Sequence, residues 1–269
     1  MLLLGNWQLS RADEKITLME RAESASLAQA VPLASLDLVK TESVSAVLSP
    51  AEAAKTGEHH YTRVLVRGEW LSDQQFLWDN RIHKGVAGYE VLTPLVLSDE
   101  ELSTELALSE PPVVLVNRGW VAAESYRSVL PDITMQLAVD DVSVEGLLTA
   151  PSKGFARGDA LSQQQRQDTQ QHNNEQGRDW PMVLQFMDYA AIADALGTSV
   201  IAGVVQGSRL PTPEDEAAFL YTNNWSPVAN GPEKHYGYAF QWFAMFIALC
   251  VIFIVTNLKN KDQTIEGRE

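Results

Sequence analysis

Apolar and polar residues alternate in several short stretches along the middle of the chain, and this alternation predicts β-strands. The clearest example is YTRVLVRGEW, from Tyr61 to Trp70. The same pattern predicts strands at Gln75–Asn80, Tyr89–Leu97, Val113–Val121, Val142–Leu148, Met182–Phe186 and Ser199–Gln206. Several short strands joined by turn-rich links are typical of an antiparallel sheet that is curled into a barrel or sandwich.

Three segments have the composition of helices. Arg11–Ala30 is rich in Ala, Glu and Leu and contains neither Gly nor Pro, so we expect a helix that ends before Pro32. The other two are Asp99–Leu108 and Met187–Leu196, and Gly197 provides a stop signal for the last of them. The predicted fold class is therefore α+β, with peripheral helices around the sheet.

A charge-free run from His235 to Leu258 is long enough to cross a bilayer, because a helix rises about 1.5 Å per residue and the hydrocarbon core is about 30 Å thick. Lys259 and Lys261 follow this run, whereas the acidic bulk of the chain precedes it. By the positive-inside rule the C-terminus is cytoplasmic. We therefore expect a protein of the bacterial inner membrane whose large domain lies on the periplasmic side.

The remaining boundaries follow from composition. Leu2–Leu4 is too short an apolar block to span a membrane, and we expect it to be the last turn of a longer spanning helix whose earlier part is missing. A Gln- and Asn-rich stretch predicts a flexible surface loop. The predicted organisation is a remnant of the first spanning helix at 1–10, an extracytoplasmic domain at 11–234 with the Gln-rich loop at 157–179, a spanning helix at 235–258 and a tail at 259–269.

Charge and cysteine content argue against several functions. The formal net charge of −15 repels phosphate backbones and argues against nucleic-acid binding. Cys250 is the single cysteine and lies within the apolar run, which argues against an intrachain disulfide, a thiol redox pair and covalently attached haem c. We find no phosphate-binding, dinucleotide-binding or nucleophile-elbow signature, so the sequence does not favour an enzyme.

His235 opens the apolar run beside aromatic residues. An imidazole at the outer end of a spanning helix can ligate haem iron, and it can equally serve as an interfacial anchor. Tyr238 and Trp242 follow His235 at spacings that favour one helix face. This stripe predicts either a surface for a porphyrin ring or a packing face for another helix.

Two arginines end predicted strands in similar settings. Arg81 follows Asn80, and Arg118 follows Asn117 and stands two residues before Trp120. Their guanidinium groups could bind the carboxylates of a haem or of a partner protein, or they could form internal ion pairs. Both interpretations are consistent with the sequence, and the first of them makes Arg81, Arg118 and Trp120 candidate partner-binding residues.

Four blocks of residues form a further pattern. The first contains Gly5, Trp7, Gln8, Arg11 and Lys15. The second contains Gly68, Asn80, Arg81, Gly88, Tyr89, Pro94 and Leu95. The third contains Asn117, Arg118, Gly119, Trp120 and Val121, and the fourth contains His235, Gly237, Tyr238, Gln241, Trp242 and Phe243. In this order, the blocks resemble the surfeit locus protein 1 family, whose members are assembly factors of cytochrome c oxidase.

The resemblance implies two spanning helices joined by a large outer domain, and a non-enzymatic role in building the haem a centre of oxidase subunit I. It implies that haem a is received from haem a synthase and held transiently, with His235 as an axial ligand to the iron. Tyr238, Trp242 and Phe243 would then line the ring. The implied partners are subunit I, the synthase and the lipid bilayer. The alternative is a scaffold that binds subunit I or the synthase without binding haem.

Overall fold

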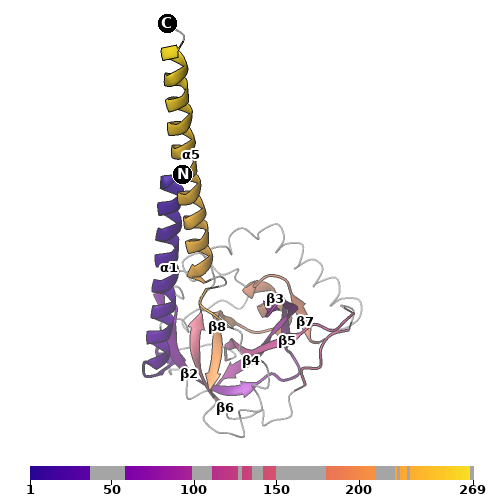
Figure 1. The fold of residues 1–269 in the computed structure, drawn as a ribbon. Coiled ribbons are helices and arrows are strands. Elements are labelled where there is room, and N and C mark those ends of the chain that lie inside the picture. The colour runs from indigo at the N-terminus through magenta and orange to yellow at the C-terminus, as the bar shows by residue number, and fades with distance from the viewer. Residues whose placement is uncertain are drawn as a thin grey trace. The chain divides into compact units, whose positions relative to one another are not determined.

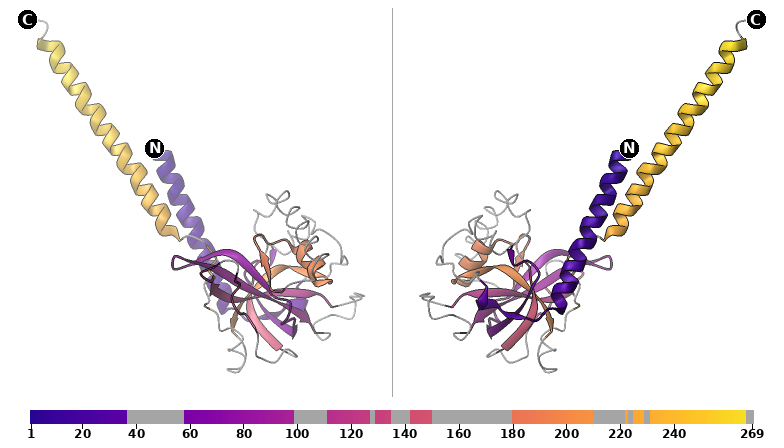
Figure 2. Two further views of the ribbon diagram at one scale, coloured as in Figure 1. Left: turned by 90° about the vertical axis from the view of Figure 1, so that its right-hand side faces the viewer. Right: turned by 90° about the vertical axis from the view of Figure 1, so that its left-hand side faces the viewer.

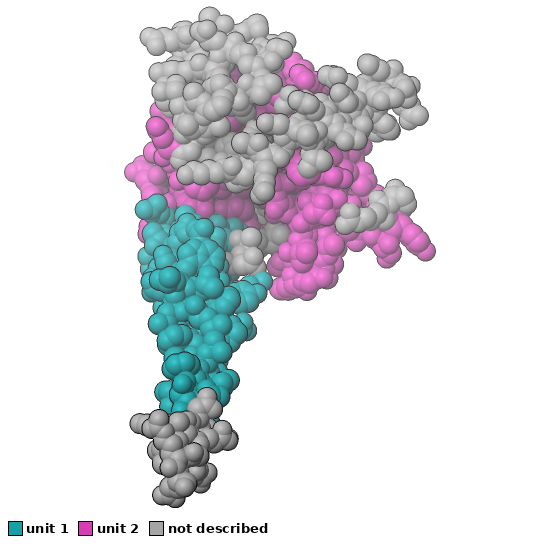
Figure 3. Space-filling model, turned by 90° about the horizontal axis from the view of Figure 1, so that it is seen from above, with its two compact units in different colours: residues 1–23, 226–269 teal, residues 24–225 magenta. Residues whose placement is uncertain are grey.

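The computed structural model describes residues 1–36, 58–98, 111–126, 129–134, 142–149, 180–209, 222, 225–228 and 231–266. The predicted helix at Asp99–Leu108 and the predicted loop at 157–179 lie outside these residues. The chain divides into two compact units, which Figure 3 shows in different colours. We call Ser24–Trp225 the sheet unit, and Met1–Glu23 together with Ser226–Glu269 the helix unit.

The sheet unit contains an eight-stranded sheet (Figure 1). Its strands are β1 (Val31–Pro32), β2 (Thr62–Trp70), β3 (Phe76–His83), β4 (Val86–Leu97), β5 (Val113–Ala122), β6 (Val142–Thr149), β7 (Met182–Leu184) and β8 (Val200–Arg209). Each strand predicted from alternation is confirmed, with ends that differ by a few residues. The two-residue strand β1 was not predicted, because two residues are too few to show a period.

The predicted direction of the strands is wrong in part. Most neighbours are antiparallel, but β1 pairs with β2, β3 with β7, and β5 with β8 in parallel, so the sheet is mixed. Alternation of apolar and polar residues reports which face of a sheet a side chain occupies, and it is the same for both directions. The sequence pattern therefore could not distinguish the two.

The order of the strands is β1-β2-β6-β8-β5-β4-β3-β7, and β2 also pairs with β4. The pairings from β2 through β6, β8, β5 and β4 thus return to β2. Gly68 lies in the β2–β4 pairing, opposite Leu97. A Cβ atom on Gly68 would lie 1.8 Å from the carbonyl oxygen of Val96. The backbones of β2 and β4 can therefore approach this closely only because residue 68 has no side chain.

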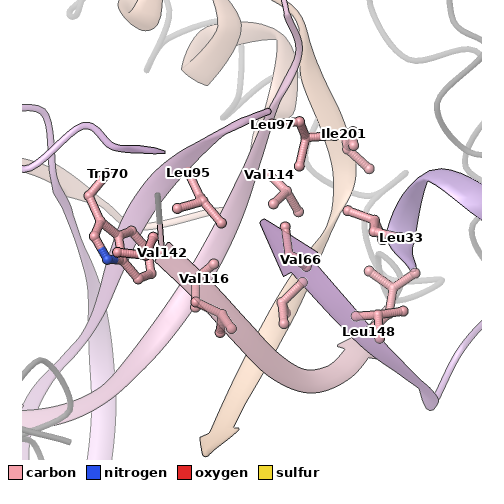
Figure 4. Close-up of a cluster of buried hydrophobic side chains, with 13 residues drawn as sticks. Leu33, Val66, Trp70, Leu95, Leu97, Val114, Val116, Val142, Leu148 and Ile201 are labelled. Atoms are coloured by element: carbon pink, nitrogen blue, oxygen red, sulfur yellow. The ribbon is translucent and has the colours of Figure 1, made fainter. Parts of the chain in front are cut away.

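Buried aliphatic side chains cover both faces of the central strands. On β4, Leu95 and Leu97 belong to one cluster, which Figure 4 shows together with residues of β2, β5, β6 and β8. Leu92 belongs to a second cluster, where Phe76 and Leu115 pack against Ile192. Burial of one such side chain stabilises the fold by about 1.5–3 kcal/mol.

Two short helical segments belong to the sheet unit: the 3-10 turn η1 (Leu33–Ser35) and the helix α4 (Tyr189–Leu196). Asp188 caps the start of α4, where its carboxylate accepts a hydrogen bond from the backbone N–H of Ala191. Gly197 ends the helix in a left-handed conformation, with φ +73. The predicted helix at Met187–Leu196 is therefore confirmed.

The two long helices are α1 (Leu2–Leu27) and α5 (Pro232–Glu266). The predicted helix at Arg11–Ala30 is confirmed as part of α1, which begins earlier and ends before Pro32 as expected. Figures 1 and 2 show α1 and α5 side by side in opposite directions. Among the described residues one helix is long and apolar enough to cross a membrane, and its candidate span is Pro232–Leu258.

Candidate functional site

His235 lies half-buried in the first turn of α5. Its ring nitrogen Nδ1 lies 2.7 Å from the side-chain oxygen Oε1 of Gln8 on α1. Both residues belong to the helix unit. The contact joins the first and the fourth of the sequence blocks. Gln8 and His235 are 227 positions apart in the chain. We call this pair the Gln8–His235 contact.

Small residues surround the Gln8–His235 contact. Gly5 and Ala12 are buried on α1, and Ala239 is buried on α5 one turn after His235. A Cβ atom on Gly5 would lie 2.6 Å from the ring of Phe243. Small residues allow two helices to approach closely, which holds side chains from both helices within hydrogen-bonding distance.

The aromatic residues of the predicted stripe occupy different environments. Trp242 and Phe243 are half-buried, as His235 is. Tyr238 is 52% exposed, and the neighbouring Tyr236 is 43% exposed. Tyr238 therefore stands exposed on α5, three residues after His235. An imidazole with aromatic neighbours is a combination of groups that suits an iron porphyrin.

A second polar constellation lies in the interior of the sheet unit, around Arg118. This arginine is 3% exposed. Its guanidinium donates hydrogen bonds to Oε1 of Gln75, at 2.8 Å, and to the hydroxyl of Thr93, at 3.3 Å. The amide of Gln75 also donates to the carbonyl oxygens of Ser72 and Ile133. Arg118 thus holds the interior of the sheet unit together and is not presented at a surface.

A row of amides continues from β5 to the strands beside it. Asn117 donates from Nδ2 to Oε2 of Glu90 and to Oε1 of Gln206, both at 2.9 Å. Gln206 donates in turn to the hydroxyl of Thr149, at 3.0 Å. Burial raises the pKa of the Glu90 carboxyl, because the charged form loses water, while Arg81 and Asn117 act in the opposite direction.

Arg81 differs from Arg118 because it keeps some exposure. Its guanidinium carbon lies 3.2 Å from the ring centre of Trp78, and its Nε lies 3.8 Å from a carboxylate oxygen of Glu90. The indole N–H of Trp120 donates to the backbone oxygen of Arg81 at 3.0 Å. The Arg81 side chain is 31% exposed. Of the three predicted partner-binding residues, Trp120 is 9% exposed and Arg118 is buried, so Arg81 presents the most accessible polar group.

Sequence patterns did not identify the partners of these groups. Gln8 belongs to the first block, but no local signal pairs it with His235. Gln75 stands directly before β3 and Glu90 within β4, and neither gives a sign in the sequence of the polar contacts that it makes. Among the residues that the structure describes, no group of three or more His, Cys, Asp and Glu side chains could hold a metal ion.

The fold and the site define a class of protein. An α+β sheet unit lies in the sequence between two long helices. One of these helices is able to span a membrane and carries a histidine at its start. The model of the SURF1 family matches residues 1–247. The chain therefore belongs to the SURF1 family, which is known as a family of oxidase assembly factors and is not typically enzymatic.

The chain is also similar to the SURF1-like protein of Dictyostelium discoideum. It is 28% identical to this chain over 120 residues, which are 45% of this chain and 38% of the relative. The matched part of the chain thus spans well under half the length of that relative.

Proposed function

We propose that this protein is a membrane-bound assembly factor of cytochrome c oxidase that assists the delivery or insertion of haem a into subunit I. Membership of the SURF1 family supports the role in oxidase assembly. The observation that carries the haem part of the proposal is the position of His235, half-buried at the start of the one described helix that is able to span a membrane.

The residues around His235 suit a haem as cargo. The iron of haem a accepts an imidazole nitrogen as an axial ligand. In this proposal His235 would provide that nitrogen, and Tyr238, Trp242 and Phe243 would line the ring. A single protein ligand allows release, which transfer to subunit I requires. The haem is received from haem a synthase, and the bilayer confines donor, carrier and acceptor to one plane.

The proposed orientation follows from the charges that flank α5. Lys259 and Lys261 follow the candidate span, and by the positive-inside rule they favour a cytoplasmic C-terminus. The sheet unit then lies on the periplasmic side of a bacterial inner membrane. In this orientation His235 stands near the outer surface of the membrane.

The test of this function is the visible absorption spectrum of the full-length protein after coexpression with haem a synthase. We expect a haem a spectrum in the wild type, its loss in His235→Ala, and its retention in His59→Ala, which removes a histidine of the sheet unit. In cells that lack the protein and any second copy of the family, we expect oxidase with reduced haem a content. Oxidase with full haem a content in those cells would overturn the proposal.

A second candidate function is that of a scaffold that binds subunit I or haem a synthase without binding haem. The turn between β3 and β4 favours it, because Ile82 is 71% exposed and Val86 is 51% exposed there. If the protein is such a scaffold, we expect cells with His235→Ala to assemble oxidase normally. We expect the double variant Ile82→Ser and Val86→Ser to reduce coprecipitation of subunit I. Arg81→Met is a further test of partner binding, because Arg81 is partly exposed. Substitution of the buried Arg118 would test folding instead.

A further inference from the structure

The Gln8–His235 contact bears on which ring nitrogen of His235 carries a proton. The atom that faces Nδ1 is the amide oxygen of Gln8, at 2.7 Å. An amide oxygen accepts hydrogen bonds and cannot donate them, so this contact favours the tautomer that carries the hydrogen on Nδ1. In a neutral imidazole the other nitrogen, Nε2, then holds a free lone pair. No hydrogen-bond partner of Nε2 lies among the described residues.

The position of Gln8 is fixed by its helix. Gly5, Gln8 and Ala12 follow one another at intervals of three and four residues, which places them on one face of α1. Gly5 and Ala12 are buried on this face, and Gln8 is half-buried between them. A side chain on a packed helix is held more precisely than one on a loop. Gln8 can therefore set both the tautomer and the orientation of the His235 ring.

We propose that Gln8 is the positioning residue for the haem ligand: it holds His235 with hydrogen on Nδ1 and leaves Nε2 as the atom that binds the iron. This inference rests on the proposed haem function and deepens it. Histidine ligands of metals commonly donate their second ring N–H to an oxygen, which fixes the ring and makes the ligating nitrogen more basic. In this protein the oxygen comes from a residue 227 positions earlier in the chain.

The proposal predicts graded effects of substitution at position 8. Gln8→Leu keeps a similar volume but removes the acceptor, and we expect haem a affinity to fall by about tenfold to a hundredfold. Gln8→Glu keeps an acceptor and adds negative charge, so haem binding should be retained and the reduction potential of the bound haem should fall. Asn6→Leu is the matched control, because Asn6 is an exposed amide on the same helix.

The experiment uses the full-length protein in detergent micelles. Haem a is titrated into the wild type and the four variants Gln8→Leu, Gln8→Glu, Asn6→Leu and His235→Ala, and the iron–histidine stretching band of the ferrous complex is recorded by resonance Raman spectroscopy. We expect this band at lower frequency in Gln8→Leu and at higher frequency in Gln8→Glu, with no change in Asn6→Leu. A residue that supported only the fold would change the amount of complex and leave the band in place.

A second measurement needs no haem. Nitrogen NMR of 15N-histidine-labelled protein reports which ring nitrogen of His235 is protonated, and we expect hydrogen on Nδ1 in the wild type and loss of this preference in Gln8→Leu. Hydrogen on Nε2 in the wild type would overturn the inference. If haem binding is lost in His235→Ala, but its affinity and band position are unchanged in Gln8→Leu, the role of Gln8 is overturned and the proposed haem function stands. A wild type that binds no haem a would overturn both the inference and the proposed haem function.

Discussion

The polar side chains of the two units differ in their burial and in how fully they are hydrogen-bonded. In the sheet unit, the side chains of Gln75, Thr93 and Arg118 are buried and bind one another. In the helix unit, Gln8 and His235 are half-buried, and the contact uses one of the two ring nitrogens of the histidine. A polar group whose bonds are completed within the protein stabilises the fold, whereas one with a remaining lone pair is available to a ligand.

This difference separates two kinds of motif residue. Arg118 and Asn117 belong to the third sequence block, and both are buried within hydrogen-bond networks. His235 belongs to the fourth block and stands in a partly accessible position. Residues that look equally functional in the sequence thus have different roles: the first two organise the sheet unit, and the third is the candidate for binding.

The largest expected effect comes from Gln75→Leu in the sheet unit. This change removes an acceptor from the buried guanidinium of Arg118 and leaves the carbonyl oxygens of Ser72 and Ile133 without their donor. We expect the free energy of unfolding to fall by about 3 kcal/mol, because a buried charge, a buried carbonyl and a part-buried carbonyl lose partners. Urea denaturation of the full-length protein in detergent, followed by tryptophan fluorescence, measures the change.

The neighbouring substitution Gln74→Leu is the control for this prediction. Gln74 is half-buried, and the expected change in unfolding free energy is within about 0.5 kcal/mol. Equal effects of the two substitutions would contradict the distinction between the units, because the buried polar network would then contribute nothing specific. Haem binding at the helix unit should persist in both variants under conditions in which they are folded.

A smaller effect is expected from Gly5→Ala in the helix unit. The new Cβ would lie 2.6 Å from the flexible ring of Phe243, which must move to accommodate it. We expect a destabilisation of about 1 kcal/mol and faster hydrogen exchange of the backbone amides of α1. Gly237→Ala is the control, because no atom lies within 4 Å of a Cβ at that position. Faster exchange in the control than in Gly5→Ala would contradict close packing at Gly5.

The smallest expected effect concerns the pH dependence that Glu90 contributes. Burial raises the pKa of this carboxyl above its ordinary value of 4.5, so the folded state binds the proton more tightly than the unfolded state does. The stability that this proton provides is complete below pH 4.5 and is lost as the pH rises through the raised pKa.

The substitution Glu90→Gln tests this dependence. In the wild type, Glu90 should make the free energy of unfolding fall as the pH rises, and the substitution should remove this contribution. Urea denaturation at several pH values above 4.5 measures the difference in slope between the two proteins. The exposed Glu69 offers the matched control Glu69→Gln. Parallel curves for the wild type and Glu90→Gln would contradict a buried carboxyl with a raised pKa.

The strands of the sheet unit could be predicted from the sequence because burial imposes a local pattern. In β2, Val64, Val66 and Trp70 are buried at alternating positions, and this regularity is visible without any other part of the chain. Strand direction and order depend on contacts between distant segments, and the parallel pairing of β5 with β8 leaves no mark on either strand. Local patterns therefore predicted the elements, and the mixed pairing had to come from the structure.

The candidate site shows the same limit. His235 could be singled out because a histidine at the start of an apolar run is unusual, and this is a local feature. The role of Gln8 could not be predicted, since glutamine is common on helices and its partner is 227 positions away. The burial of Arg118 was equally hidden, because arginine is rarely found in a protein interior and only the polar network explains its presence there.

The Gln8–His235 contact also has a consequence for synthesis of the chain. Gln8 leaves the ribosome 227 positions before His235 does. At a translation rate of about 5–20 residues per second, roughly ten to forty-five seconds separate the two. The contact cannot exist on a nascent chain until the segments that form the sheet unit have been translated. A product on which synthesis stops within those segments lacks His235, and it therefore lacks the candidate ligand.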